Sequence, residues 1–311
     1  MGLRKLIDNV YIIPGFANIG VINVPEEGQN NIYLIDSGPD REYAIKICQM
    51  LDKKFPDGYK IKAVINTHGH ADHTGGNHYF QSECGAEIWI PQKEAYLVHN
   101  LNSHVNVIWG GDAIPEVSRV YGGKESYTPT KLIKPEQCIR LYNNTWVEIA
   151  DLRGHCIQQI GLIYKGLEGH QVFFTGDAFL GIDELLKVKV SYHTYPVTAL
   201  KTLVWLQQQK ADFFVPSHGM VPADDDEYFE TTQLNITYMK SNADYLLEKI
   251  KEEDLTTEEL VAKSIMHFKI RVKVLNYALI HSTIKSLLSE LYEQDLIGIE
   301  YREGYFYWTS K

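Results

Sequence analysis

Short apolar runs alternate with a stretch of helical periodicity along the first third of the chain. Four of these runs are apolar enough for buried strands: 10–13, 19–24, 31–35 and 62–65. Between the last two, residues 40–54 place Tyr43, Ile47 and Leu51 four positions apart, which predicts one apolar face of a helix. Strands separated by a helix in this way predict an α/β domain, in which the ends of the strands are the natural place for a site.

The same pattern resumes further along the chain. Five more apolar runs predict strands, the last four of them in a second sheet: 87–90, 138–142, 146–149, 160–164 and 172–175. Residues 198–209 carry leucines at helical spacing and predict another helix, and shorter helices are expected after Gly75 and at 92–99. Residues 100–135 show turn and aromatic residues with little periodicity. We expect an irregular segment there, which inside a compact domain is usually functional or mobile.

The C-terminal part of the chain reads as a separate small unit. The elements expected there are a long helix at 227–251, a charged break at 251–254, a helix start at 255–260, a helical stretch at 272–294 and a hairpin at 296–308. The charged break is the best candidate for a domain boundary. We therefore expect a large domain over residues 1–250 and a small α+β module over residues 255–311.

Length and composition narrow the class of protein. The 311 residues suffice for one large and one small domain, and 44% hydrophobic content with 23% charged content is ordinary for a globular chain. A formal net charge of −10 argues against broad attraction to nucleic acid or anionic membrane, and no apolar run is long enough to span a bilayer. The four cysteines have no paired spacing and no targeting segment is recognised, so free thiols and a cytoplasmic location are expected.

One stretch of the sequence carries more chemistry than any other. Directly after the strand at 62–65 come His68, His70, Asp72 and His73, four ligand-type side chains within six positions. Histidines two positions apart at a strand end point the same way, and neutral imidazole with carboxylate is a donor set that Zn²⁺ prefers. A single histidine is more often a surface or core residue, but this density at a strand end indicates a metal site.

The spacing His-X-His-X-Asp-His in this stretch resembles the signature of the metallo-β-lactamase superfamily. Three later strand ends resemble the positions of that family's remaining ligands: His155, Asp177 and His218. The resemblance implies one metal ion on His68, His70 and His155, a second on Asp72, His73 and His218, and Asp177 as the bridge between them. Asp36 matches the family's early aspartate, which usually braces the site without binding metal.

The resemblance also implies a fold and a reaction. The fold would be an αββα sandwich over residues 1–250, followed by a winged-helix-like module. Two divalent ions per chain, zinc ahead of iron or manganese, would share a metal-bound hydroxide as the nucleophile, with Asp72 as a ligand and as the proton acceptor. Residues 100–135 would form either one wall of the pocket or a variable surface excursion, and His104, like His99 before it, is interpreted as a non-ligand.

The substrate is less constrained than the site. At the third motif this chain has Arg153-Gly154-His155-Cys156 where the family often has Pro-Gly-His, and Cys156 is expected to pack beneath the metals rather than to approach them. The acidic chain favours hydrolysis of a small acyl substrate such as a thioester or a lactone. The alternative is a metal-dependent phosphodiesterase or endoribonuclease acting on single-stranded nucleic acid, and a non-catalytic metal-binding protein forms a third class.

The C-terminal module raises the question of macromolecular partners. Its Lys269, Arg271, Lys273 and Lys285 are offset by several acidic residues, whereas a helix-turn-helix reader of DNA normally shows a basic face. We therefore favour packing or homodimerisation over nucleic-acid binding as the role of this module. No association with membranes is expected.

Overall fold

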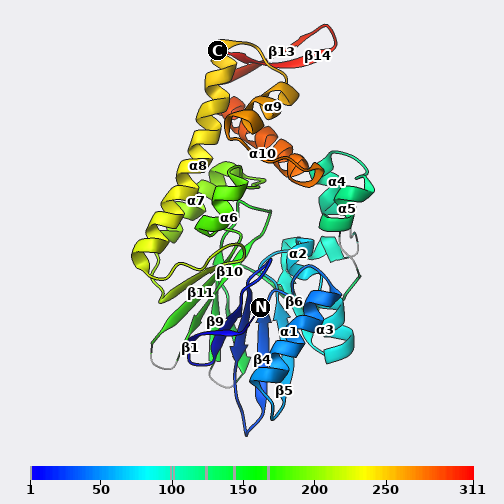
Figure 1. The fold of residues 1–311 in the computed structure, drawn as a ribbon, viewed down its shortest axis with the longest axis vertical. Coiled ribbons are helices and arrows are strands. Elements are labelled where there is room, and N and C mark those ends of the chain that lie inside the picture. Colours follow the sequence, from blue (N-terminus) through cyan, green and yellow to red (C-terminus); the bar gives the residue numbers. More distant parts are fainter. Residues whose placement is uncertain (1, 99, 101, 123–124, 143–144, 167–168) are drawn as a thin grey trace.

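The structure of the chain is a computed structural model, which describes residues 2–98, 100, 102–122, 125–142, 145–166 and 169–311. Two β-sheets pack face to face with helices on their outer sides, and a C-terminal module stands at one end of this sandwich (Figure 1). The layering is the predicted αββα arrangement. His99, interpreted above as a non-ligand, lies outside the described residues.

Within the described ranges, the first sheet has seven strands that follow one another in chain order. They are β1 (Arg4–Ile7), β2 (Val10–Ile13), β3 (Ile19–Asn23), β4 (Asn30–Ile35), β5 (Tyr59–Ile65), β6 (Glu87–Pro91) and β7 (Lys131–Ile133). β1 to β4 are antiparallel, whereas β4 to β7 run parallel. The five strands expected in this half are present, and β1 and β7 were not expected. Because the carboxyl ends of parallel strands share one edge, the polar residues after β4 and β5 come together.

The second sheet has five strands among the described residues, in the order β12-β11-β10-β9-β8. Their bounds are β8 (Cys138–Tyr142), β9 (Thr145–Asp151), β10 (Ile160–Lys165), β11 (Gln171–Gly176) and β12 (Phe213–Pro216). Ile35 and Ile65 of the first sheet belong to one buried cluster with Ile149 and Val215 of the second. Burial of such a side chain contributes about 1.5–3 kcal/mol, so the apolar face shared by the sheets holds the sandwich together.

Helices cover both outer faces of the sandwich. α1 (Arg41–Lys54) begins at Asp40, whose side chain accepts a hydrogen bond from Tyr43 N at 2.8 Å, and buries Ile47 and Leu51 against the first sheet, as its periodicity predicts. The other helices of this half are α2 (Ala71–Thr74), α3 (Asn77–Cys84) and the 3₁₀ helix at Gln92–Val98. The second sheet is covered by α7 (Pro196–Leu206) and the first part of α8 (Asp225–Glu252), and α6 (Ile182–Val188) contacts α8. α6 was not expected from the sequence.

The expectation of an irregular segment over residues 100–135 is wrong. The segment contains α4 (Ser103–Trp109) and α5 (Pro115–Tyr121) besides β7. Each helix is seven residues long, which is too short for a repeating apolar pattern to be recognised. Local signals are nevertheless present, since Pro115 occupies the first turn of α5 and Gly110 ends α4 in the left-handed conformation.

The C-terminal module consists of two helices and a hairpin with a core of its own. Its elements are α9 (Thr257–His267), α10 (Val274–Glu293), β13 (Ile297–Arg302) and β14 (Tyr305–Ser310). Its apolar cluster includes Leu260, Leu288 and Trp308, and also Leu246 and Ile250 from the end of α8. α10 reaches back over the sandwich and contacts α4 and α5 (Figure 1). The winged-helix-like nature of this module and the division between residues 250 and 255 stay predictions.

No described helix combines the length and apolarity needed to cross a bilayer.

Candidate metal centre

The turn after β5 is folded so that its ligand-type side chains share one side. Asn66 Nδ2 donates to the carbonyl of His73 at 3.0 Å, and Thr74 Oγ1 donates to the carbonyl of His70 at 3.0 Å, which closes the short helix α2. A Cβ atom on Gly75 would collide with the backbone carbonyl of Pro39. Glycine is therefore required there for the close approach of the two backbone segments.

The structure brings the seven predicted ligands together. They form three overlapping groups, in each of which the ligand atoms lie within 4.8 Å of one another: His68, His70 and His155; His68, His73 and Asp177; and Asp72, His73 and His218. The first and third groups are the two ligand sets that the sequence pattern implies. His155 Nε2 lies 3.0 Å from His70 Nδ1, although 85 residues separate the two in the sequence.

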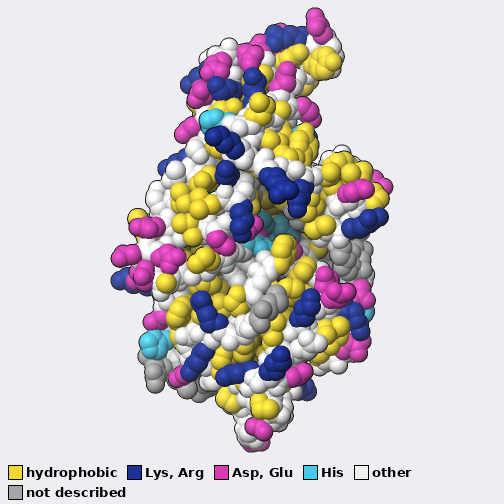
Figure 2. Space-filling model, in the orientation of Figure 1, with side chains coloured by type: hydrophobic (Ala, Val, Ile, Leu, Met, Phe, Trp, Pro, Cys, Tyr) yellow, Lys and Arg dark blue, Asp and Glu magenta, His cyan; other side chains and the backbone are white. Residues whose placement is uncertain are grey.

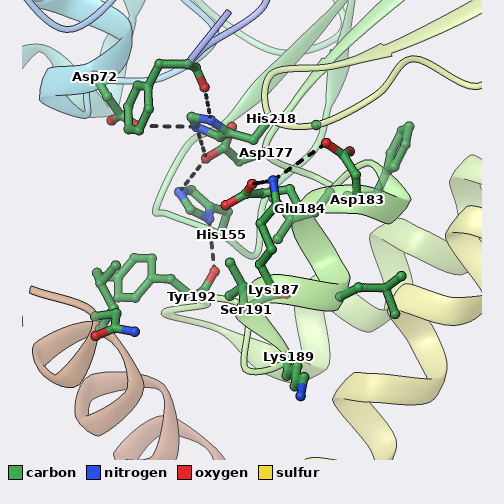
Figure 3. A pocket seen from close by; sticks show the side chains of 18 of the residues that line it. Asp72, His155, Asp177, Asp183, Glu184, Lys187, Lys189, Ser191, Tyr192 and His218 are labelled. Carbon is green, nitrogen blue, oxygen red and sulfur yellow. Dashed lines mark hydrogen bonds and ion pairs between the residues drawn. The ribbon is translucent and has the colours of Figure 1, made fainter. Parts of the chain in front are cut away.

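Asp177 lies between the groups, at the end of β11. Its carboxylate oxygens are 3.5 Å from His73 Nε2, 3.4 Å from His155 Nε2 and 3.5 Å from His218 Nε2. Figure 3 shows this carboxylate between the rings of His155 and His218. Such a position suits a carboxylate that bridges two cations.

Several candidate ligands are oriented by a second partner behind them. His155 Nδ1 donates to the carbonyl of Tyr192 at 3.0 Å, and His218 Nδ1 donates to the carbonyl of Phe16 at 2.8 Å. These bonds fix the tautomer of each ring and leave its Nε2 lone pair directed into the site. The sequence gives no signal for these partners, because each acts through a backbone oxygen.

Asp36 is the carboxylate that braces the first motif. It accepts hydrogen bonds from Thr67 N at 2.8 Å, from Thr67 Oγ1 at 2.9 Å and from His73 Nδ1 at 2.9 Å. The Thr67 hydroxyl also lies 3.1 Å from His68 Nδ1, so one carboxylate controls the orientation of two candidate ligands. Asp36 has a φ of 64°, a left-handed conformation that aspartate and asparagine tolerate better than most residues.

Burial is the largest influence on the histidine pKa values. It lowers the pKa of His68 and His70 well below its usual range, so these rings are neutral and offer a lone pair. At His73 and His218 burial acts in the same direction, but the neighbouring carboxylates, including Asp177, outweigh it. They raise the pKa of His73 well above its usual value and that of His218 to about 9. A metal ion would take the place of these protons.

The donor atoms fit a divalent cation. Nε2 of His68 and His73, and Oδ1 of Asp177, are buried without a hydrogen-bond partner among the described residues. A buried polar atom without a partner costs about 1–3 kcal/mol, so three of them in one group of side chains favour an ion that satisfies them together. Imidazole nitrogen and carboxylate oxygen are the ligands that zinc and related divalent metals take.

A cavity of about 1200 Å³ opens above these residues. Figure 2 shows histidine side chains at the bottom of a hollow on the face of the molecule. α4 and α5 contribute His104 and Val120 to its lining, which supports the interpretation of this segment as one wall of the pocket. The lining also includes the loop between α9 and α10, which no motif in the sequence assigns to the site.

Two further residues near the centre, Cys156 and His104, stand outside the three groups of candidate ligands. Cys156 is buried and its pKa is raised by burial, and it belongs neither to the three groups nor to the cavity lining. His104 stacks on His70 with ring centroids 3.7 Å apart, and it stands outside the three groups of described residues. Its interpretation as a non-ligand stays a prediction.

Comparisons with known proteins agree with this geometry. Residues 12–130 match the sequence profile described as the Metallo-beta-lactamase superfamily. Hydroxyacylglutathione hydrolase GloC from Haemophilus influenzae is 27% identical over 172 residues, which are 54% of this chain and 71% of that protein. The probable metallo-hydrolase YflN from Bacillus subtilis is 31% identical over 78 residues, which are 25% of this chain and 29% of that protein.

Solved structures extend the likeness of fold to nearly the whole chain. A beta-lactamase domain protein from Burkholderia ambifaria has a TM-score of 0.70 at 14% identity, with 99% of this chain and 93% of that one covered. A metallo-beta-lactamase family protein from Thermus thermophilus has a TM-score of 0.70 at 15% identity, with 99% and 100% covered. The chain belongs to the metallo-beta-lactamase superfamily of metal-dependent hydrolases.

Proposed function

We propose that the chain hydrolyses an acyl bond in a small molecule, a thioester or a lactone, with two divalent metal ions, zinc first among them. The observation that carries this proposal is the convergence of seven ligand-type side chains, five of which line one cavity. The thioester is favoured because a relative is named as the hydrolase of an acylated glutathione.

The ligand sets follow the three groups of side chains. One ion would be held by His68, His70 and His155, a second by Asp72, His73 and His218, and both by Asp177. When bound, such ions supply Lewis-acid polarisation and lower the pKa of a bound water to near 7. The other steps of the proposed reaction are carried out by side chains of the protein.

Asp72 is the proposed proton acceptor. Its Oδ2 lies 3.2 Å from His218 Nε2, and its side chain is 16% exposed and lines the cavity, so a water can reach it. In the proposed reaction the water oxygen forms a bond to the acyl carbon while Asp72 takes up the proton. The bond from that carbon to sulfur, or to the lactone oxygen, then breaks, and the leaving group receives the proton.

The shape of the cavity favours a small molecule over nucleic acid. α10 contacts α4 and α5, so the C-terminal module and the 100–121 segment meet across the cavity. A volume of about 1200 Å³ is just above the range of roughly 300–1000 Å³ for ordinary small-molecule sites. Direct assays of RNA cleavage and of oligomeric state test the two alternatives, endoribonuclease activity and a homodimer.

Metal analysis and a substrate panel test the proposal. The wild-type chain should retain about two equivalents of metal after reconstitution. His68→Ala should chiefly lose the first ion and His218→Ala the second, whereas the partly exposed His78→Ala serves as a control and should keep both. The panel should contain thioesters, lactones and short single-stranded RNAs. One equivalent or less in the wild type, or cleavage of RNA alone, would overturn the proposal.

A further inference from the structure

We propose that the loop joining α9 and α10 is an anion-binding subsite of this cavity, and that it selects thioesters whose thiol half carries carboxylate or phosphate groups. The subsite, here called the cationic loop, consists of Lys269, Arg271 and Lys273. The inference rests on the proposed acyl hydrolysis and names the class of substrate.

The cationic loop faces the metal centre across one cavity. The side chains of Lys269, Arg271 and Lys273 line the same cavity as the candidate ligands His70 and His218. Figure 2 shows Lys and Arg side chains gathered on the rim above the histidines. A substrate can therefore have its acyl carbon at the metal centre while a distant group contacts the loop.

The charges of the loop are not neutralised by the chain. Among the described residues, no carboxylate lies within ion-pair distance of the three side chains of the cationic loop, which are exposed. Lys187, in the same cavity, is different, since its Nζ is 3.7 Å from Asp183 and 3.1 Å from Glu184 (Figure 3). Because the whole chain carries a net charge of −10, this positive potential is a local property of the cavity.

The backbone of the loop is held in place, so the loop is positioned at the cavity before a ligand arrives. Asn276 Nδ2 donates to the carbonyl of Arg271 at 3.0 Å, and Lys273 N donates to Asn276 Oδ1 at 2.6 Å. Ile270 is buried in the C-terminal cluster, and Lys189 Nζ donates to the carbonyl of Phe268 at 2.9 Å. The N-terminus of α10 follows directly and adds the positive end of a helix dipole.

The rest of the lining indicates what lies between the two ends of the substrate. Leu275 and Leu279 of α10, Val120 of α5 and Leu186 of α6 give the cavity apolar walls. An occupant with one anionic end and a less polar middle fits this lining better than RNA, which carries a charge on every nucleotide. Thiols of this kind bear either carboxylates, as glutathione does, or phosphates, as coenzyme A does.

The test compares three thioesters that share one acyl group on different thiols: glutathione, coenzyme A and the uncharged N-acetylcysteamine. The metal-loaded full chain should show a kcat/KM at least about tenfold higher for one of the anionic thioesters than for the neutral one. Added salt should reduce this preference, because screening weakens contacts between exposed charges. Which anionic thioester is preferred distinguishes carboxylate from phosphate recognition.

A triple variant assigns the preference to the loop. Lys269→Gln, Arg271→Gln and Lys273→Gln together should lower the ratio of anionic to neutral kcat/KM by about tenfold, chiefly through KM, with metal content retained. The matched control removes three exposed lysines outside the cavity: Lys46→Gln, Lys60→Gln and Lys201→Gln. It makes the same change in net charge and should leave the ratio unaltered. An equal fall in both variants, or an unaltered ratio in the loop variant, overturns the assignment.

A binding measurement separates the subsite from the proposed function. S-alkyl glutathione and S-alkyl coenzyme A cannot be hydrolysed, and their binding to the metal-loaded chain can be followed by calorimetry. Binding that depends on the loop, without turnover of any thioester, would keep the subsite and reject acyl hydrolysis. Turnover of thioesters without loop-dependent binding would do the reverse. Loop-dependent cleavage of short RNA alone would overturn both.

Discussion

The floor of the cavity and the wall formed by the cationic loop are built in different ways. On the floor, the rings and carboxylates of the seven candidate ligands are mostly buried and are fixed by carbonyls and by Asp36. On the wall, the cationic loop presents exposed side chains whose charges meet no carboxylate among the described residues, although its backbone is fixed. In the proposed function the floor holds the metal ions and carries out the chemistry, whereas the wall binds the anionic part of the substrate. Changes to the floor should act mainly on kcat and metal content, and changes to the wall on KM.

The largest effect is expected from a change on the floor that keeps its shape. Asp72→Asn retains one oxygen ligand but removes the negative charge and the proton affinity, so kcat should fall by roughly 10²–10⁴-fold with little change in KM. The measurement must be made at saturating metal, because a weakened second ion would imitate a catalytic defect. Glu184→Gln changes a carboxylate of the same cavity outside the ligand groups and is the control. Near-normal turnover of fully metallated Asp72→Asn would leave Asp72 as a ligand only.

A smaller effect is expected from changing Asp36, which holds the candidate ligands in place from behind. Asp36→Asn keeps the left-handed backbone but weakens the acceptor shared by His73 and Thr67, so metal affinity should fall by about 10–100-fold. Competition with a chelator measures this affinity. Asp295→Asn is a matched control, because Asp295 has a similar φ of 63° and lies in the C-terminal module. If Asp36→Asn binds metal like the wild type, the bracing role is refuted.

The smallest effect is expected from destabilising the C-terminal module, which contains the cationic loop. Thr256 caps α9, accepting from Glu259 N while its own N–H donates to the Glu259 carboxylate at 2.8 Å. Thr256→Ala should lower the free energy of unfolding by about 1 kcal/mol without loss of metal. Thr237→Ala, at an exposed position inside α8, is the control. Thermal unfolding and metal content together check the prediction, and metal loss in Thr256→Ala would show that floor and wall are not separable.

The sequence predicts the floor better than the wall for physical reasons. His68 to His73 are neighbours along the chain, so their shared chemistry is visible without a fold, and the apolar runs predict the strands that carry them. His155 and His218 are each isolated in the sequence, and only the family pattern joins them to the motif. The carbonyl of Tyr192 has no sequence signal at all, since every residue has such an oxygen.

The charge pattern of the sequence does not predict the wall. Summed over the whole module, the basic residues Lys269 and Arg271 are balanced by acidic residues such as Glu290, yet the structure places no carboxylate against them among the described residues. Charge balance along a sequence and charge balance at a surface are different quantities, because screening limits an exposed charge to neighbours within about 8 Å. The helices α4 and α5 were missed for another reason, since seven residues hold too few turns for a periodic pattern.

α8 has a mechanical consequence. Its 28 residues span roughly 42 Å; near its start Tyr228 stacks on Phe214 of the sandwich, and near its end Ile250 lies in the C-terminal cluster. α8 thus connects the C-terminal module to the sandwich, and α10 makes a second connection through its contacts with α4 and α5. The position of the C-terminal module over the cavity is therefore set by two contacts that are far apart in the sequence, one through α8 and one through α4 and α5.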